Sequence, residues 1–250
     1  MSVRLTLAGN ASVLLEGTGI RLAMDPWLSP AIGPWKRLKE PGFCHRSLAG
    51  LDAILISHAH PDHLCRETLA QVPKKTPVVS PPGTPLYRLT QMGFEIVRSV
   101  DAWDSWSPGS DVEVIATPCF HTRYSVGFLI RLHGQTIYFA GDASPRTPFR
   151  EIARRCGPID VALLPVGGSS LAAGPLQRHL TPLRAAHAAC ELEARSVIPM
   201  HWGHMACFPA MLDRFRGTAE QFQLALHAVG ARTVCHDLED GETLLLDTAG

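Results

Sequence analysis

Residues 57–63 constrain the fold of this chain more than any other feature of its sequence. They read Ser-His-Ala-His-Pro-Asp-His and follow a short apolar run at 52–57 that is typical of a buried strand. Three imidazoles and a carboxylate are costly to bury for packing alone, because each imidazole needs its own hydrogen-bond partners. They are, however, the ligands that suit Zn²⁺ and similar ions. The segment therefore predicts a metal centre at the end of a strand, the alternative being a His-rich surface turn.

Three further residues that can bind metal follow apolar runs of the same kind. His121 follows residues 112–120, Asp142 follows 136–141 and His201 follows 196–200. A single histidine at a strand end is more often structural than a ligand. Four such junctions, however, can converge on one rim of a sheet, where a rigid scaffold holds functional side chains. The sequence therefore predicts one cluster assembled from four strand ends.

Short apolar runs alternate with helical patterns along the whole chain, which favours an α/β layered fold. We find no repeat or low-complexity tract and expect a single domain spanning residues 1–250. The expected strands are 3–7, 12–15, 20–24, 52–57, 77–80, 95–97, 112–116, 125–132, 136–140, 161–165, 196–200, 232–235 and 242–246. The expected helices are 65–71, 84–92, 147–156, 181–194 and 218–229, with N-terminal capping signals at Thr181 and Thr218. Residues 28–48 have the composition of a long loop, a kind of segment that is usually functional.

Charge and cysteine content narrow the class of protein. The chain has 23 basic and 23 acidic residues, and its arginines are scattered rather than gathered in a stripe, so we expect no nucleic-acid partner. No run of 18 apolar residues predicts a transmembrane helix, and the N-terminus lacks the apolar core of a signal peptide. Seven cysteines without a Cys-x-x-Cys pair argue against a disulfide scaffold or a zinc ribbon. We therefore expect a cytoplasmic protein.

The motif His-Ala-His-Pro-Asp-His, then His121, Asp142 in Phe-Ala-Gly-Asp and His201 in Pro-Met-His-Trp-Gly together resemble the metallo-β-lactamase superfamily. The resemblance extends from about residue 5 to 246 and implies a four-layer αββα sandwich with two metal ions at one edge of its sheets. It implies the following ligands: His58, His60 and His121 for the first ion, Asp62, His63 and His201 for the second, and Asp142 as a bridge. Imidazole and carboxylate ligands favour two Zn²⁺ ions, with Mn²⁺ or iron as alternatives.

Four segments resemble one branch of this superfamily, which contains N-acylphosphatidylethanolamine phospholipase D and L-ascorbate-6-phosphate lactonase. They are Leu-Ala-Gly-Asn-Ala-Ser-Val, Met-Asp-Pro-Trp-Leu, Ile-Tyr-Phe-Ala-Gly-Asp-Ala-Ser and Ile-Pro-Met-His-Trp-Gly. The chain has Asn10 where that branch often has histidine, and His204 where it usually has threonine. His179 begins a segment similar to the branch's His-Met-x-Pro element, which makes it a candidate for the pocket wall. The alternative for His179 is a surface histidine beside a helix.

The resemblance implies hydrolysis of a phosphodiester or of a lactone or ester in a small-molecule or lipid-like substrate. Two cations lower the pKa of a shared water to roughly 7, and the resulting hydroxide can attack phosphorus or carbonyl carbon. We expect Asp62, Asp142 and His179 to be catalytic, with Asp142 holding the ions and His179 serving the leaving group or an oxyanion. The 28–48 loop and its neighbour Trp27 would cover the mouth and contact the substrate through Trp27, Trp35, Arg37 and Lys39.

Other functions remain as alternatives. A di-iron oxygenase or redox enzyme is known on this fold, although the flavodiiron type usually has Glu in place of His60 and carries a flavodoxin domain. An RNA-processing nuclease is a weaker alternative, because this chain lacks an inserted substrate-binding domain and a basic patch. A degenerate, non-enzymatic centre is disfavoured by the complete set of ligands.

Two further residues lie near the predicted cluster in the sequence. Asp25 ends a strand, and either orients a ligand imidazole or caps the following turn. Cys119 lies two residues before His121, and we interpret it as a buried thiol rather than a ligand.

Overall fold

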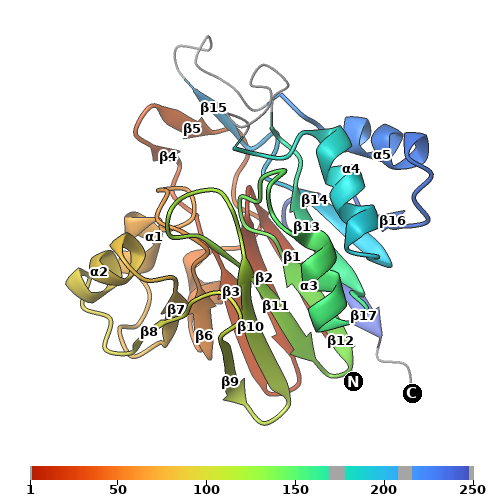
Figure 1. Ribbon diagram of the computed structural model, residues 1–250. Coiled ribbons are helices and arrows are strands. Elements are labelled where there is room, and N and C mark those ends of the chain that lie inside the picture. The colour runs from red at the N-terminus through yellow and green to blue at the C-terminus, as the bar shows by residue number, and fades with distance from the viewer. Residues whose placement is uncertain (1, 169–177, 208–215, 248–250) are drawn as a thin grey trace.

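The computed structural model describes residues 2–168, 178–207 and 216–247 (Figure 1). Two seven-stranded mixed sheets form its centre, and a three-stranded sheet lies at one end of them. The first sheet has the order β17 (Thr243–Asp247), β1 (Ser2–Gly9), β2 (Ser12–Gly17), β3 (Ile20–Met24), β6 (Ala53–Leu55), β7 (Val78–Ser80) and β8 (Val97–Ser99). The second has the order β16 (Val234–Cys235), β14 (Ser196–Met200), β13 (Val161–Pro165), β12 (Gln135–Phe139), β11 (Val126–Leu132), β10 (Val112–Pro118) and β9 (Ser105–Gly109).

The period-two pattern of the first sheet places its side chains in two separate cores. Along β2, Val13 and Leu15 face the large core between the sheets, whereas Leu14 belongs to the smaller core. The same alternation holds in β6, where Leu55 faces the large core and Ile54 the smaller one. Because successive side chains point to opposite faces of a strand, both faces of this sheet are covered.

Helices cover the outer faces of both sheets. The helices α1 (Arg66–Ala70) and α2 (Thr84–Gln91) close the smaller core beside the first sheet, and α3 (Phe149–Cys156), α4 (Pro182–Glu191) and α5 (Ala219–Ala228) lie along the second (Figure 1). The predicted four-layer αββα sandwich is confirmed. Both predicted N-caps are present, since Thr181 accepts a hydrogen bond from the Arg184 amide and Thr218 forms a capping box with Gln221. Among the described residues, no helix has the length and apolarity needed to cross a membrane.

The direction of the strands gathers the predicted site at one rim. β3, β6, β7 and β8 are parallel neighbours, as are β12, β13, β14 and β16. Their carboxyl ends therefore share one end of the sandwich, which is the upper end in Figure 1. β10 runs in the same direction, because it is separated from β12 by one antiparallel strand.

The prediction of a long loop at residues 28–48 was wrong. The segment contains β4 (Ala31–Ile32), β5 (Trp35–Arg37) and a 3₁₀ helix at His45–Leu48. β5 pairs with β4 and also with β15 (Met205–Cys207), a strand that the sequence did not reveal. These strands form the three-stranded sheet β15-β5-β4 above the rim (Figure 1). Strands this short escape a periodicity analysis, because two or three residues do not establish a pattern.

Candidate metal centre

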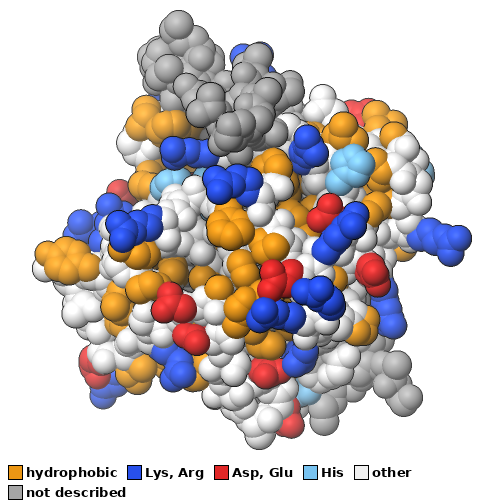
Figure 2. Space-filling view, viewed as in Figure 1, with side chains coloured by type: hydrophobic (Ala, Val, Ile, Leu, Met, Phe, Trp, Pro, Cys, Tyr) orange, Lys and Arg blue, Asp and Glu red, His pale blue; other side chains and the backbone are white. Residues whose placement is uncertain are grey.

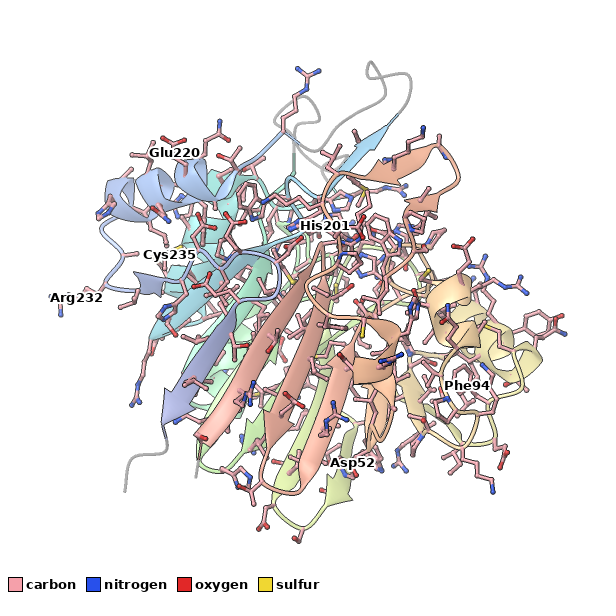
Figure 3. The ribbon with its side chains drawn as sticks, turned by 180° about the vertical axis from the view of Figure 1, so that it is seen from behind. Asp52, Phe94, His201, Glu220, Arg232 and Cys235 are labelled. Atoms are coloured by element: carbon pink, nitrogen blue, oxygen red, sulfur yellow. The ribbon has the colours of Figure 1, made fainter. Side chains whose placement is uncertain are left out.

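The structure brings all seven predicted ligands together. The segment from His58 to His63 follows β6, His121 follows β10, Asp142 follows β12 and His201 follows β14. Their ligand atoms fall into overlapping groups, in each of which the atoms lie within 4.8 Å of one another. Figure 3 shows the labelled His201 at the upper rim, above the strand ends and far from Asp52 at the opposite end of the first sheet.

The first group, which we call the imidazole triad, consists of His58, His60 and His121. His60 Nδ1 lies 3.1 Å from His121 Nε2. The Nε2 atoms of His58 and His121 lie 3.6 Å and 3.5 Å from Asp142 Oδ2. Three ring nitrogens and a carboxylate oxygen thus face a common point.

The second group, which we call the mixed triad, consists of Asp62, His63 and His201. Asp62 Oδ2 lies 3.1 Å from His201 Nε2 and 3.4 Å from His63 Nε2. The same two nitrogens lie 3.3 Å and 3.1 Å from Asp142 Oδ1. Asp142 is therefore between the triads, with Oδ2 toward the imidazole triad and Oδ1 toward the mixed triad.

The backbone before Asp142 explains the Phe-Ala-Gly-Asp sequence. Gly141 has a φ of 56°, a left-handed conformation that favours glycine. A Cβ atom at this position would also lie 3.0 Å from the Ser57 Cβ. Glycine therefore lets the end of β12 approach the segment after β6, and this approach places Asp142 among the histidines.

Asp25 lies directly behind the mixed triad. It is fully buried, and its Oδ2 accepts a hydrogen bond of 2.7 Å from His63 Nδ1. Ser57 donates to the same carboxylate through its amide, at 2.7 Å, and through its hydroxyl. Of the two predicted roles for Asp25, the geometry favours the orientation of a ligand imidazole.

Asn10, in the turn between β1 and β2, contacts two members of the mixed triad. Its side-chain Nδ2 donates to Asp62 Oδ2 at 3.1 Å, and its backbone carbonyl accepts from the His201 backbone amide at 2.8 Å. Both Asn10 and His201 have a φ of 57°, and Asp25 has a φ of 43°. Such conformations are rare for residues other than glycine and are concentrated at functional sites. In the sequence, Asn10 stands out only because the branch that this chain resembles often has histidine there, and no local signal predicts its contact with Asp62.

The electrostatics of the two triads differ. Burial lowers the pKa of His58 well below its usual value, and the nearby His63 lowers it further. Burial by itself would also lower the pKa of His63, but Asp142, Asp62 and Asp25 outweigh it and raise that pKa well above its usual value. The histidines in turn hold the pKa of Asp142 well below its usual range, against the effect of burial. His63 and His201 likewise hold the pKa of Asp62 well below its usual range, against the effect of burial. Asp62 and Asp142 are therefore both ionised at neutral pH.

The remaining candidates have distinct positions. His179 is three-quarters buried, with Nδ1 at 3.7 Å from Asp142 Oδ2 and its ring beside those of His121 and His201, so it belongs to the cluster. Cys119 is buried as predicted, its thiol pointing to the Ala140 carbonyl at 3.7 Å. His204 lies 2.7 Å from Asp240, outside the cluster.

The predicted substrate contacts of Trp27, Arg37 and Lys39 do not fit their surroundings. Trp27 is completely buried, and the Arg37 guanidinium lies 4.6 Å above its ring while donating to the Ala8 and Trp27 carbonyls. Lys39 forms an ion pair with Glu239 at 2.9 Å. These side chains attach the three-stranded sheet to the rest of the molecule.

The donor set fits divalent metal ions. His58 Nε2, His63 Nε2 and Asp142 Oδ1 are buried and make no hydrogen bond to any described residue. Leaving a buried polar atom without a hydrogen bond costs about 1–3 kcal/mol, as for His58 Nε2, and a cation between the triads would remove that cost. His63 Nε2 and Asp142 Oδ1 form an ion pair at 3.1 Å and would both face such a cation. Support of ligand histidines by a carboxylate or carbonyl, as seen for His63 and His121, is typical of metal centres.

Comparison with known proteins identifies related sequences. Residues 21–202 match the model of the β-lactamase superfamily domain. The chain is 32% identical over 233 residues to a UPF0173 metal-dependent hydrolase of Pyrococcus furiosus, with 86% of this chain and 92% of that protein covered. It is 33% identical over 236 residues to a UPF0173 metal-dependent hydrolase of Thermococcus kodakarensis, with the same coverage of 86% and 92%.

Solved structures share the fold at lower identity. Igni18, a metallo hydrolase from Ignicoccus hospitalis, gives a TM-score of 0.70 at 23% identity and covers 99% of both chains. An isothiocyanate hydrolase from gut bacteria of Delia radicum gives 0.77 at 19% identity, with 98% of this chain and 100% of that chain covered. The di-iron β-hydroxylase CmlA of Streptomyces venezuelae gives 0.70 at 20% identity, with 98% of this chain and 54% of that chain covered.

Proposed function

The chain belongs to the UPF0173 metal-dependent hydrolases of the metallo-β-lactamase superfamily, and on this basis we propose that it uses two metal ions to hydrolyse a phosphodiester or a lactone or ester. The position of Asp142 carries the proposal, because each of its oxygens faces a different triad. The imidazole triad would hold one ion, the mixed triad the other, and Asp142 would bridge them. Zn²⁺ is the ion that this donor set favours.

The residues of the cluster would have different roles in binding the ions and in catalysis. Two bound ions supply Lewis acidity and a water of lowered pKa. Asp142 and Asp62, ionised at neutral pH, balance the cationic charge and fix the ligand nitrogens around it. His63 is oriented by Asp25. His121 donates through Nδ1 to the Arg178 carbonyl at 3.0 Å, so its Nε2 carries no proton and can bind the ion.

His179 would donate a hydrogen bond to the oxyanion of the transition state. Burial lowers its pKa to about 3, so the neutral imidazole is the form present at neutral pH. A neutral imidazole can donate one N–H to a developing negative charge, but it carries no surplus proton for a leaving group. This favours oxyanion binding over proton donation, the two roles that the sequence left open.

A metal assay combined with a hydrolysis screen tests the proposal. Elemental analysis after reconstitution at neutral pH should give two equivalents of metal per chain, and phosphodiesters or lactones and esters should be cleaved. Less than one equivalent would refute the dinuclear centre. Two equivalents of iron with O₂ consumption and no hydrolysis would instead favour an oxygenase, the second candidate that the structural similarity to CmlA raises.

Kinetics of His179→Ala test the oxyanion role. The variant should keep both metals while kcat falls by ~10²–10³, the range typical for loss of one oxyanion donor. Esters with good and poor leaving groups should lose equally. A smaller loss for p-nitrophenyl esters than for alkyl esters would show that His179 donates a proton after all.

A further inference from the structure

A groove with a volume of about 440 Å³ opens directly beside the imidazole triad. His121 forms part of its wall, and Arg123, Arg146 and Arg178 line it as well. These arginines come from the loops after β10 and β12 and from the segment before α4, so the fold gathers them from distant parts of the sequence. Figure 2 shows Lys and Arg side chains near a histidine in the upper part of the described surface.

The three guanidinium groups have no acidic partner among the described residues. Arg131, Arg155 and Arg195, by contrast, form ion pairs of 2.7 to 2.9 Å elsewhere on the molecule. The protein as a whole carries no formal net charge, so the groove is a local concentration of positive charge on a neutral chain. Charge of one sign in a concave surface attracts ligands of the opposite sign.

Two of these arginines lie near aromatic rings. The Arg146 guanidinium lies 5.9 Å from the centre of the Phe120 ring, and that of Arg123 lies 5.4 Å from the Tyr124 ring. An arginine near an aromatic face keeps its planar edge of N–H donors available, and this edge matches the two oxygens of a carboxylate or phosphate.

Hydrogen bonds hold the two loops of the groove together. The Thr147 hydroxyl accepts from the amides of Phe120 and Ser144, each at 3.3 Å, and the Ser144 hydroxyl donates to the Phe120 carbonyl. The loop that carries Arg146 is therefore fixed to the loop that leads to His121. A pre-organised site of this kind binds with less loss of conformational entropy.

We propose that this groove binds an acidic substituent of the substrate, a carboxylate or a phosphate, while the bond to be hydrolysed lies at the metal centre. The inference rests on the proposed function and specifies its substrate class. Because His121 belongs both to the groove and to the imidazole triad, an anion bound by Arg123, Arg146 and Arg178 would lie next to the reacting group. Neutral esters would lack this contact and would be poorer substrates.

Binding of inorganic phosphate to the metal-loaded protein tests the groove without catalysis. Calorimetric titrations at constant ionic strength should give a Kd about tenfold weaker for Arg146→Gln and for Arg178→Gln, the loss expected for one hydrogen bond to a charged group. Arg154→Gln, an exposed arginine of α3 outside the groove, is the matched control and should bind phosphate as the wild type does. Equal affinities in all variants, or an equal loss in the control, would overturn the proposal.

A pair of esters then tests the link to hydrolysis and distinguishes carboxylate from phosphate. The p-nitrophenyl monoester of succinate carries a free carboxylate, and p-nitrophenyl butyrate is a neutral ester of similar length. Arg146→Gln should lower kcat/KM about tenfold for the succinate ester and leave the butyrate ester unchanged. A loss for both esters would contradict an anion site, and competition by phosphate but not acetate would assign the groove to phosphate. If neither ester is cleaved, the proposed hydrolase activity is in question, while the phosphate titration still decides the groove.

Discussion

The two triads that face Asp142 are supported in different ways. In the mixed triad, the buried carboxylate of Asp25 holds His63, and the amide of Asn10 holds Asp62. In the imidazole triad, His58 is 3.0 Å from the Ser57 hydroxyl and His121 donates to a backbone carbonyl. His60 is only partly buried, and its ring has no hydrogen-bond partner outside the cluster among the described residues.

This difference predicts two ion positions of unequal strength. A carboxylate behind a ligand histidine fixes the ring and raises its basicity, and loss of such a partner typically costs 10- to 100-fold in metal affinity. The mixed triad has this support and is closed from solvent on the side of Asp25. We therefore expect it to hold its ion more tightly than the imidazole triad, whose ion would exchange first.

Asp142→Asn should have the largest effect, because only Asp142 faces both triads. The amide keeps the shape of the side chain but removes the negative charge that balances two cations. We therefore expect kcat to fall by at least ~10³ and the affinity for both metal ions to fall. Asp25→Asn, which leaves the faces of both triads intact, should lose far less activity. Elemental analysis and kcat measured side by side provide the comparison, and similar behaviour of the two variants would show that Asp142 is not the bridge.

Single-ligand variants should separate the two positions. His60→Ala should lose the ion of the imidazole triad and keep the ion of the mixed triad, which should resist a chelator. His63→Ala should keep only the ion of the imidazole triad, and a chelator should remove that ion readily. The reason is that only the second variant destroys the site supported by Asp25. Chelator titrations followed by elemental analysis measure both, with the wild type expected to lose its ions in two steps. A single step in the wild type would mean that the triads are equivalent.

Asn10→Gly should have a smaller effect than Asp142→Asn or the single-ligand variants. Glycine adopts the φ of 57° without strain, so the substitution removes the side-chain contact to Asp62 while keeping the turn. We expect affinity for the tighter ion to fall about tenfold, the lower end of the range for partners behind a ligand. Affinity for the weaker ion should not change. If both affinities fall together, Asn10 acts by holding the turn rather than by orienting Asp62.

The ligands could be predicted from sequence because each one interrupts an apolar pattern. His58, Asp142 and His201 follow apolar runs that are typical of buried strands, and the parallel direction of these strands then places them on one rim. The caps at Thr181 and Thr218 were visible for a similar reason, since the signal lies within four consecutive residues. Such local patterns can be recognised in the sequence because they do not depend on which distant segments pack together.

Features that depend on distant pairing were not visible. The arginines of the groove are 23 and 32 residues apart in the sequence, from 123 to 146 and from 146 to 178, and they appeared scattered for that reason. Asn10 contacts Asp62 across 52 residues, and no local pattern distinguishes it from an ordinary turn residue. Likewise, β5 acquires its partner β15 from the far end of the chain.

The pairing of β1 with β17 has a consequence for how the centre is made in the cell. The amino-terminal strand finds this neighbour only after residues 243–247 have been synthesised, and His201 also comes from the last fifth of the sequence. Contacts between segments so far apart in sequence form late, because closing long loops costs entropy before any contact repays it. A ribosome-bound chain therefore carries Asp62 and His63 for most of its synthesis without His201, the residue that completes the mixed triad. The mixed triad can therefore hold an ion with all three of its ligands only after this late segment has folded onto the rim, whereas the residues of the imidazole triad are available earlier.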